Sequence, residues 1–221
     1  MPRDLPVDLL NNYSRETVFR RKNASTFKKL AKTTHFSYRE VEALAIIHRK
    51  IVETKGPMNR YVFHDIYHAG LDLTNNKRHL LIDRIFSTFD KSNSLQINYV
   101  DWVEGMSVVL RGTLDERIRF AFSVYDYWKT NKLNKENIFQ MLRGCIFRLP
   151  ENEDTEQAVK DLVELLLKKI DVDRDGFVSD EDFAAAVRKN PLYLECMGPV
   201  FPTRPARQAF LNTFTDTPTR Y

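Results

Sequence analysis

Cysteine and glycine are scarce in this chain, and long apolar runs are missing. Only two of the 221 residues are cysteine, Cys145 and Cys196, and only seven are glycine. Two cysteines are too few for a disulfide framework, so we expect a reduced, cytoplasmic compartment. No segment has the roughly 20 consecutive apolar residues of a membrane-spanning helix, and no signal peptide is recognisable, so we expect no membrane partner.

Motifs of catalysis and of nucleic-acid binding are also missing. The sequence shows no glycine-rich phosphate loop and no nucleophile–base pair. His64 and His68 have a spacing that can hold zinc, but no glutamate follows His64 and there is no third ligand. No basic motif interleaved with aromatic residues indicates nucleic acid. We therefore expect a protein that binds ions and other proteins, and not an enzyme.

One stretch, residues 171–182, has the pattern of an EF-hand calcium loop. Such a loop has oxygen donors at positions 1, 3 and 5, glycine at 6, a backbone carbonyl ligand at 7, a helper at 9 and a carboxylate at 12. Gly176 fits position 6, because only glycine adopts a positive φ without strain. The alternative is an acidic turn in a solvated loop. The predicted metal ligands are Asp171, Asp173, Asp175, Phe177 (through its carbonyl), Ser179 and Asp182.

Position 12 departs from the usual pattern. Asp182 stands where glutamate normally binds Ca²⁺ with both oxygens, and its side chain is one methylene shorter. We therefore expect a single weak Ca²⁺ site, with a dissociation constant of roughly 10⁻⁵ M or weaker and with Mg²⁺ as a competitor.

Three further loop frames have lost most of these ligands. They cover residues 51–62, 90–101 and 126–137. In the first frame only Glu53 could provide a carboxylate ligand for a metal ion. In the second, Leu95 replaces the glycine, although a branched side chain resists positive φ. In the third, Trp128 takes position 3 and lysines surround the centre. We expect none of the three to bind calcium.

Together the four frames form an internal repeat of helix–loop–helix units. One hand cannot bury its apolar face alone, so hands pair, and the repeat predicts an all-α fold with two lobes of paired EF-hands. Position 8 is apolar in each loop and should form short β-bridges. The expected pairs are Met58 with Ile97 and Leu133 with Val178.

Capping signals and composition set the expected boundaries. Ser37 with Glu40, and Thr113 with Glu116, are capping boxes that predict helix starts. We divide the chain into a basic N-terminal arm (1–33), an N-terminal pair of hands (34–112), a C-terminal pair (113–190) and a C-terminal helix and tail (191–221). In the tail, we expect three aromatic anchors: Phe201, Phe210 and Phe214.

The charge of the chain is concentrated at its ends. The net charge is +4, but residues 1–32 carry +5 and residues 187–221 carry +3, which leaves −4 for the body. We expect residues 1–25 to have little fixed structure alone and residues 26–34 to form a short helix. The ends are either solvated tails or basic arms that dock on an acidic surface such as tubulin.

Several segments are similar to a known family. They are residues 83–90 (DRIFSTFD), 102–116 (WVEGMSVVLRGTLDE) and 168–171 (KKID), continuing to Val187 and Arg188. With the order of the frames, they resemble the calaxin family of the neuronal calcium sensor-like branch of EF-hand proteins. The resemblance implies a protein of the outer dynein arm docking complex on axonemal doublet microtubules, in cilia and flagella, that links calcium to beating. Its implied partners are docking-complex coiled coils, the dynein heavy chain and tubulin.

Two functional hypotheses remain open. The first is a structural adaptor of the axoneme with one residual metal site, because the second and third loops lack ligands that the family has. The second is a soluble calcium sensor that binds and releases a target helix as calcium rises. A switch usually loads two paired loops, and this chain can load one. Methionine, the adaptable residue of sensor grooves, also occurs only five times.

Overall fold

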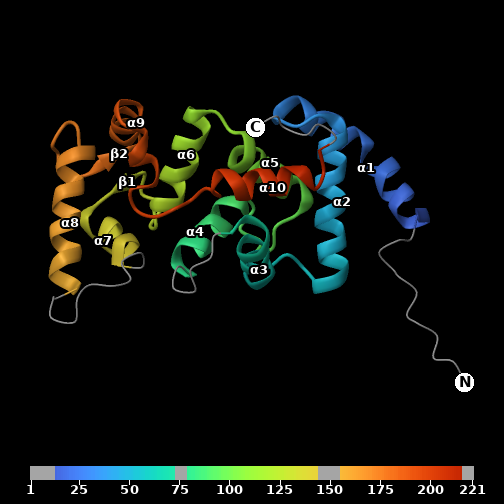
Figure 1. Cartoon of the computed structure of the whole chain (residues 1–221), viewed down its shortest axis with the longest axis horizontal. Helices are drawn as coiled ribbons and strands as arrows, with labels where there is room; N and C mark the ends of the chain where they lie inside the picture. Colours follow the sequence, from blue (N-terminus) through green and yellow to red (C-terminus); the bar gives the residue numbers. More distant parts are fainter. Residues whose placement is uncertain (1–12, 73–78, 144–154, 216–221) are drawn as a thin grey trace, which may run out of the picture.

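The computed structural model describes residues 13–72, 79–143 and 155–215. Within these ranges the regular secondary structure is helical apart from one pair of two-residue strands (Figure 1). The elements are α1 (Tyr13–Thr33), α2 (Tyr38–Lys55), α3 (Arg60–Leu71), α4 (His79–Phe89), α5 (Tyr99–Arg111), α6 (Leu114–Tyr125), β1 (Lys132–Leu133), α7 (Lys135–Arg143), α8 (Thr155–Ile170), β2 (Val178–Ser179), α9 (Asp180–Lys189), the 3₁₀ helix η2 (Pro191–Glu195) and α10 (Arg204–Asn212).

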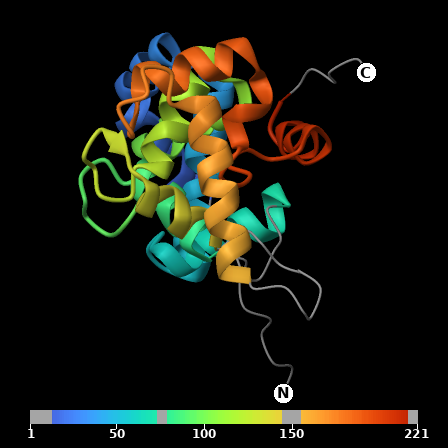
Figure 2. The same cartoon turned by 90° about the vertical axis from the view of Figure 1, so that its left-hand side faces the viewer.

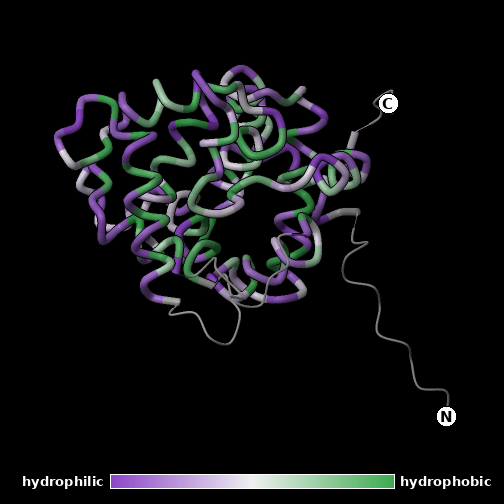
Figure 3. Tube along the Cα trace, turned by 60° about the vertical axis from the view of Figure 1, so that its left-hand side comes forward, coloured by the Kyte–Doolittle hydropathy of each residue, from purple (hydrophilic) through white to green (hydrophobic). Residues whose placement is uncertain are grey.

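The helices form the two predicted lobes. Helices α2 to α5 make the N-terminal lobe, and α6 to α9 make the C-terminal lobe, which lies at the left of Figure 1. Apolar and hydrophilic residues alternate along each helix (Figure 3), as amphipathic helices around a core require. The buried apolar side chains form one continuous cluster through both lobes. The predicted fold class is confirmed.

Both predicted capping boxes are present. The hydroxyl of Ser37 accepts from the backbone N–H of Glu40 (3.4 Å), and the Glu40 carboxylate accepts from the N–H of Ser37 (2.8 Å). Thr113 and Glu116 make the same reciprocal pair at the start of α6. Because each box satisfies two backbone donors that a helix end leaves unpaired, it determines where the helix begins.

The predicted contacts between paired loops are also present. Leu133 pairs with Val178 and Lys132 with Ser179 in an antiparallel register, which makes the strands β1 and β2. In the N-terminal lobe the N–H of Ile97 donates a 2.9 Å hydrogen bond to the carbonyl of Met58. These contacts join loop to loop within each lobe.

The N-terminal segment corrects our prediction. Residues 13–33 form one continuous helix, α1, where we expected little fixed structure up to residue 25. Phe27 is fully buried, and the ring of Phe19 lies edge-on to Tyr99 at 5.7 Å between centroids. Asn23 accepts a 2.8 Å hydrogen bond from the Tyr99 hydroxyl, 76 positions away. The prediction was wrong because the partners that hold this helix are distant in sequence.

The first loop is shorter than the predicted frame of 51–62. Helix α2 continues to Lys55, so the first five positions of that frame are helical, and Glu53 forms an ion pair with Arg49 at 2.7 Å. Gly56, with φ of +88°, ends the helix. The frame was wrong because it assumed a 12-residue loop around this glycine.

The C-terminal segment connects the two lobes. The Tyr125 hydroxyl of α6 donates to the carbonyls of Leu194 (3.2 Å) and Gly198 (2.8 Å), which holds the segment on the C-terminal lobe. The chain then crosses to α10, which packs against α3 in the N-terminal lobe (Figure 1). The Phe214 ring lies 5.9 Å from that of Phe36.

All three predicted anchors of the tail make apolar contacts: Phe201 is buried, and Phe210 and Phe214 pack partly buried on the core. Cys196 lies in the same segment, and burial raises the pKa of its thiol to about 12. Cys145 lies outside the described residues. No helix of the described ranges has both the length and the apolar character needed to cross a membrane.

Candidate metal centre

Three carboxylates converge in the loop between α8 and α9. Oxygen atoms of Asp171, Asp173 and Asp175 lie within 4.8 Å of one another, and this is the one group of at least three such potential ligands in the described part of the chain. Asp171 is half-buried, and the other two are exposed. These are positions 1, 3 and 5 of the predicted loop, so the structure brings together the first half of the predicted ligand set.

The backbone of this loop is held by the same carboxylates. Asp171 accepts from the N–H of Gly176 (3.0 Å) and of Arg174 (2.7 Å). Asp173 and Asp175 each accept, through Oδ1, from the N–H two residues later, at 3.1 and 2.8 Å. Gly176 has a φ of +87°, which glycine adopts without strain. The short side chains therefore fold the loop around its own centre.

The second half of the predicted set has a different arrangement. The Ser179 hydroxyl accepts from the N–H of Asp182 (3.1 Å), and Asp182 Oδ2 accepts from the N–H of Ser179 (3.1 Å), which makes a capping box at the start of α9. The Ser179 hydroxyl also donates to Asp182 Oδ2 (2.6 Å). Asp182 is thus oriented toward Ser179 and is not a member of the carboxylate group. The ring of Phe177, whose carbonyl we predicted as a ligand, lies 5.4 Å from Lys132 Nζ.

Hydrogen bonding keeps Asp182 ionised more readily than an ordinary aspartate. Burial by itself would raise the pKa of this carboxyl, but hydrogen bonds from the hydroxyl and the N–H of Ser179, together with those from the backbone of Val172 and Asp173, outweigh burial and lower it. A carboxylate that stays negative at the edge of the loop complements a cation there. The donor set, made of carboxylate oxygens, fits a hard divalent ion such as Ca²⁺ or Mg²⁺.

The second and third loops keep the same backbone design. Asp90 accepts from the N–H of Leu95 at 2.7 Å, and Asp126 accepts from the N–H of Asn131 at 2.8 Å, as Asp171 does from Gly176. Leu95 has a φ of +62° and is 68% exposed. The left-handed conformation costs a branched residue roughly 1–2 kcal/mol, and the position 1 carboxylate compensates for it through the hydrogen bond.

The side chains at the centres of these two loops are no longer carboxylates. In the second loop the Ser94 hydroxyl donates to the carbonyl of Gln96 (2.7 Å). In the third, the Trp128 side chain at position 3 is 59% exposed. Figure 2 shows the two loops protruding side by side, and Lys129 of the third donates to Asn93 of the second at 3.3 Å. The second and third loops therefore keep the conformation of an EF-hand loop without its carboxylate ligands.

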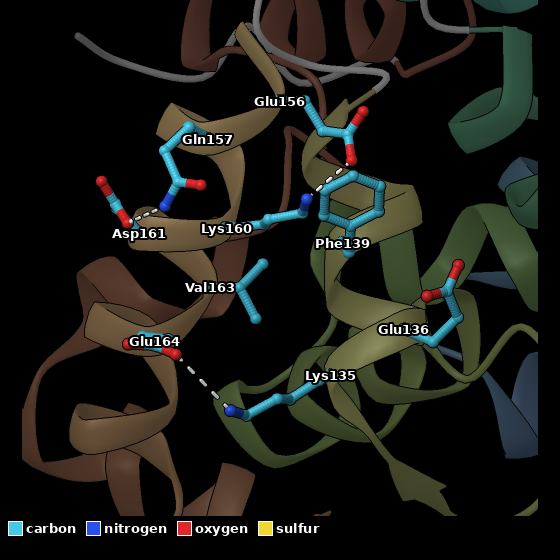
Figure 4. A pocket seen from close by; sticks show the side chains of 9 residues that line it. All are labelled: Lys135, Glu136, Phe139, Glu156, Gln157, Lys160, Asp161, Val163 and Glu164. Atoms are coloured by element: carbon cyan, nitrogen blue, oxygen red, sulfur yellow. Dashed lines mark hydrogen bonds and ion pairs between the residues drawn. The ribbon is translucent and has the colours of Figure 1, made fainter. Parts of the chain in front are cut away.

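A groove lies in the same lobe, between α7 and α8 (Figure 4). It has a volume of about 420 Å³, and Phe139 and Val163 provide its apolar surface. Two ion pairs lie beside it, at 2.7 and 3.6 Å: Glu156–Lys160 and Lys135–Glu164. Because α8 leads directly into the acidic loop, the groove and the candidate metal centre share a helix.

Comparisons with known proteins agree with this architecture. A family model described as an EF-hand domain pair matches residues 115–188, the C-terminal lobe. The chain is 38% identical over 195 residues to the calaxin of Xenopus laevis, covering 86% of this chain and 91% of that protein. It is 37% identical to the calaxin of Bos taurus and 35% to that of Homo sapiens, each over 83% of this chain and 92% of the relative. The chain therefore belongs to the calaxin family and is a calcium-binding EF-hand protein.

Proposed function

We propose that this protein is a calcium-binding component of the outer dynein arm docking complex, in the axonemal cytoskeleton of cilia and flagella. There it helps to anchor dynein on doublet microtubules and to regulate beating. The observation that carries the proposal is the convergence of Asp171, Asp173 and Asp175 in a chain that matches calaxins over most of its length. The proposed partners are docking-complex coiled coils, the dynein heavy chain and tubulin.

We assign the metal ligands to the fourth loop. Asp171, Asp173 and Asp175 supply three carboxylates, Phe177 its carbonyl, and Ser179 and Asp182 close the site from α9. Ser179 bonds only Oδ2 of Asp182, so we assign Oδ1 to the ion. A bound Ca²⁺ supplies positive charge that offsets the repulsion among these carboxylates, and by mass action it stabilises the folded lobe.

A single loaded loop favours an adaptor over a switch. An EF-hand sensor opens when a pair of loops binds ions together, whereas the partner of the fourth loop presents Trp128 and lysines. Tertiary connections between the lobes also favour a fixed arrangement, among them the C-terminal segment, the contact of α4 with α6, and the contact of α5 with α6.

Calorimetry tests the metal assignment. Titration of the purified chain with CaCl₂ should give one site per chain, with a dissociation constant of roughly 10⁻⁵ M or weaker, and a separate titration should detect Mg²⁺ binding. Asp171→Ala should abolish the Ca²⁺ signal while Asp115→Ala, an exposed carboxylate on α6, leaves it unchanged. Two or more tight sites would contradict the assignment.

Localisation tests the axonemal role. A tagged chain should be enriched in axonemes of ciliated or flagellated cells, remain with doublet microtubules after detergent extraction, and co-purify with docking-complex proteins. A chain found only in the soluble fraction would contradict the role and would favour the alternative.

That alternative, a soluble calcium sensor that binds a target helix reversibly, has one observation in its favour. The groove between α7 and α8 offers Phe139 and Val163 beside the candidate metal centre. A sensor should show a large fluorescence change on calcium addition, whereas the adaptor should show a small one from exposed Trp128 and almost none from buried Trp102.

A further inference from the structure

The outer face of α1 is uniformly basic. Its exposed cations are Arg15, Arg21, Lys22, Lys28, Lys29 and Lys32. At 3.6 residues per turn, these positions fall within an arc of roughly 140° of the helix circumference. The one acidic residue of α1, Glu16, lies on the other side and forms an ion pair with Arg20. We call these six cations the α1 basic face.

Most of this face has no counterion within the described part of the chain. No ion pair joins Arg21, Lys22, Lys28, Lys29 or Lys32 to a residue that the structure describes. Elsewhere, exposed cations pair with a carboxylate at 2.7–3.1 Å in three examples: Lys55–Asp65, Arg60–Asp83 and Arg188–Asp115. Helix α1 thus gathers, on one face of a single helix, five cations without such an ion pair to a described residue.

The basic face is held rigidly in place from behind. Phe27 and Leu30 are buried against the N-terminal lobe, and Phe19 packs against Tyr99. Like charges at i and i+4, such as Lys28 and Lys32, destabilise an isolated helix. The apolar contacts maintain the helix despite this repulsion, so an anionic partner would meet the charges already aligned and would relieve the repulsion.

We propose that the α1 basic face binds a flexible acidic polypeptide tail. Arg15 and Lys32 are separated by 17 positions, which at 1.5 Å per residue is about 26 Å. An extended peptide of about eight residues spans that distance. The occupant is therefore a run of about eight or more residues rich in glutamate or aspartate.

The composition of the face favours an acidic peptide over other polyanions. No aromatic side chain lies among the six cations, so the face lacks the stacking platform that single-stranded nucleic acid uses. Val18 is the one large apolar side chain exposed on it, which gives too little apolar area for insertion into a lipid interface. This inference deepens the proposed function, on which it rests for its biological setting, because it specifies the chemistry of one docking partner.

Fluorescence anisotropy with a labelled peptide of ten glutamates tests the inference. The full chain should bind it, should not bind a peptide of ten glutamines, and should lose affinity as salt rises from low concentration to about 0.2 M, because exposed charges are screened over about 8–10 Å. The triple variant R21E/K28E/K32E should weaken binding by about tenfold or more, because it removes three exposed ion pairs with the peptide, each of which contributes about 0.5 kcal/mol.

A matched control separates the face from net charge. The variant K168E/K169E/K189E makes the same charge change on exposed residues of the C-terminal lobe. It should change peptide affinity less than about twofold, and an equal loss in both variants would overturn the proposal. A melting curve checks that α1 stays folded. If R21E/K28E/K32E melts early, R21Q/K28Q/K32Q replaces it and should still weaken binding, whereas unchanged affinity would overturn the proposal.

Two further arms test the class of ligand. Vesicles containing anionic lipid and a ten-nucleotide single-stranded RNA should bind more weakly than the glutamate peptide at the same salt concentration, and tighter binding of either would overturn the choice of a polypeptide. The result is separable from the axonemal role. If the chain reaches axonemes but does not bind the peptide, only this inference is contradicted. If the chain binds the peptide but does not reach axonemes, only the proposed function is contradicted.

Discussion

Arg84 in α4 donates a 2.9 Å hydrogen bond from Nη2 to the carbonyl of Asp126, the first residue of the third loop. The same guanidinium donates to the carbonyls of Val124 (3.2 Å) and Ser123 (3.3 Å) at the end of α6. It therefore satisfies carbonyls that a helix end leaves unpaired, and it does so from the other lobe. Burial lowers the pKa of Arg84, and the negative charge of Asp126 counteracts part of that effect. One side chain thus fixes α6 relative to α4.

Replacing Arg84 should loosen this connection. Arg84→Met keeps the aliphatic length but removes the side-chain donor to the carbonyls of Ser123 and Val124 and one of the two donors to that of Asp126, so we expect the free energy of unfolding to fall by about 2 kcal/mol. Urea denaturation followed by circular dichroism measures the change. Arg119→Met, an exposed cation on α6, is the control and should change stability by less than about 0.5 kcal/mol. Equal effects of the two substitutions would mean that Arg84 does not join the lobes.

Lengthening position 12 should strengthen calcium binding. Asp182→Glu adds the methylene that allows bidentate contact with Ca²⁺, and glutamate is also a normal partner in a capping box, so α9 should still begin at the same place. We expect about a tenfold lower dissociation constant for Ca²⁺ in calorimetry, while Asp182→Asn should raise it. An unchanged or higher constant for Asp182→Glu would show that position 12 does not reach the ion.

Lys132 should weaken the calcium site from the neighbouring loop. Its Nζ lies 3.6 Å from Asp175 Oδ2 and 5.4 Å from the centre of the Phe177 ring, so a positive charge already stands beside a proposed ligand. Lys132→Met should lower the dissociation constant for Ca²⁺ by about two- to fivefold, the scale of an exposed ion pair.

The control for this effect is Lys135→Met. Lys135 is also exposed, but it pairs with Glu164, away from the acidic loop. It should leave the affinity for Ca²⁺ unchanged, and the gain in Lys132→Met should shrink as salt increases. A loss of affinity in Lys132→Met would mean that the lysine supports the loop and does not compete with the ion.

His48 should make the N-terminal lobe sensitive to acid. Its Nε2 contacts the carbonyl of Ile97 at 2.8 Å, and burial lowers the pKa of the ring despite that hydrogen bond. An unfolded chain protonates histidine with a pKa of about 6.5, so below that pH the unfolded state takes up a proton that the folded state resists. The stability contributed by neutral His48 is therefore lost as pH falls through and below about 6.5.

His48→Gln measures this contribution. The variant should be less stable than the wild type at pH 7.5, by about 1 kcal/mol for the weakened hydrogen bond. This difference in the free energy of unfolding should become smaller when urea denaturation is repeated at pH 5.5. At that pH only the wild type loses stability through His48, because its unfolded state protonates the ring while its folded state keeps the ring neutral. A gap that stays constant or widens would show that protonation of His48 is not linked to folding.

Local signals in the sequence were sufficient for the loops and the helix starts. The pattern of Asp171, Asp173, Asp175 and Gly176 predicts an EF-hand loop, and the structure brings oxygen atoms of the three carboxylates within 4.8 Å of one another. Position 8 predicted the pairing of Leu133 with Val178, and the two capping boxes predicted where α2 and α6 begin. Each of these features depends on residues a few positions apart or on a repeat visible along the chain.

Other features depended on contacts that no local pattern displays. Helix α1 extends over residues that look like a polar arm, because Tyr99 and the N-terminal lobe cover its apolar side. The orientation of Asp182 toward Ser179 was also missed, since serine at position 9 and a carboxylate at position 12 fit both a metal site and a capping box. The Ser-x-x-Asp spacing of Ser179 and Asp182 already indicated the capping box.

By itself, the sequence determined that this protein is built from four helix–loop–helix units and that one loop has the carboxylates for a cation. It could do so because loop closure, caps and amphipathic helices are short-range consequences of residue type. Only the tertiary structure decided that the basic N-terminal residues form a rigid face, that Arg84 joins the lobes and that Lys132 lies beside Asp175. These relationships arise where side chains from distant parts of the chain meet, and their energies depend on the distances and burial that packing sets.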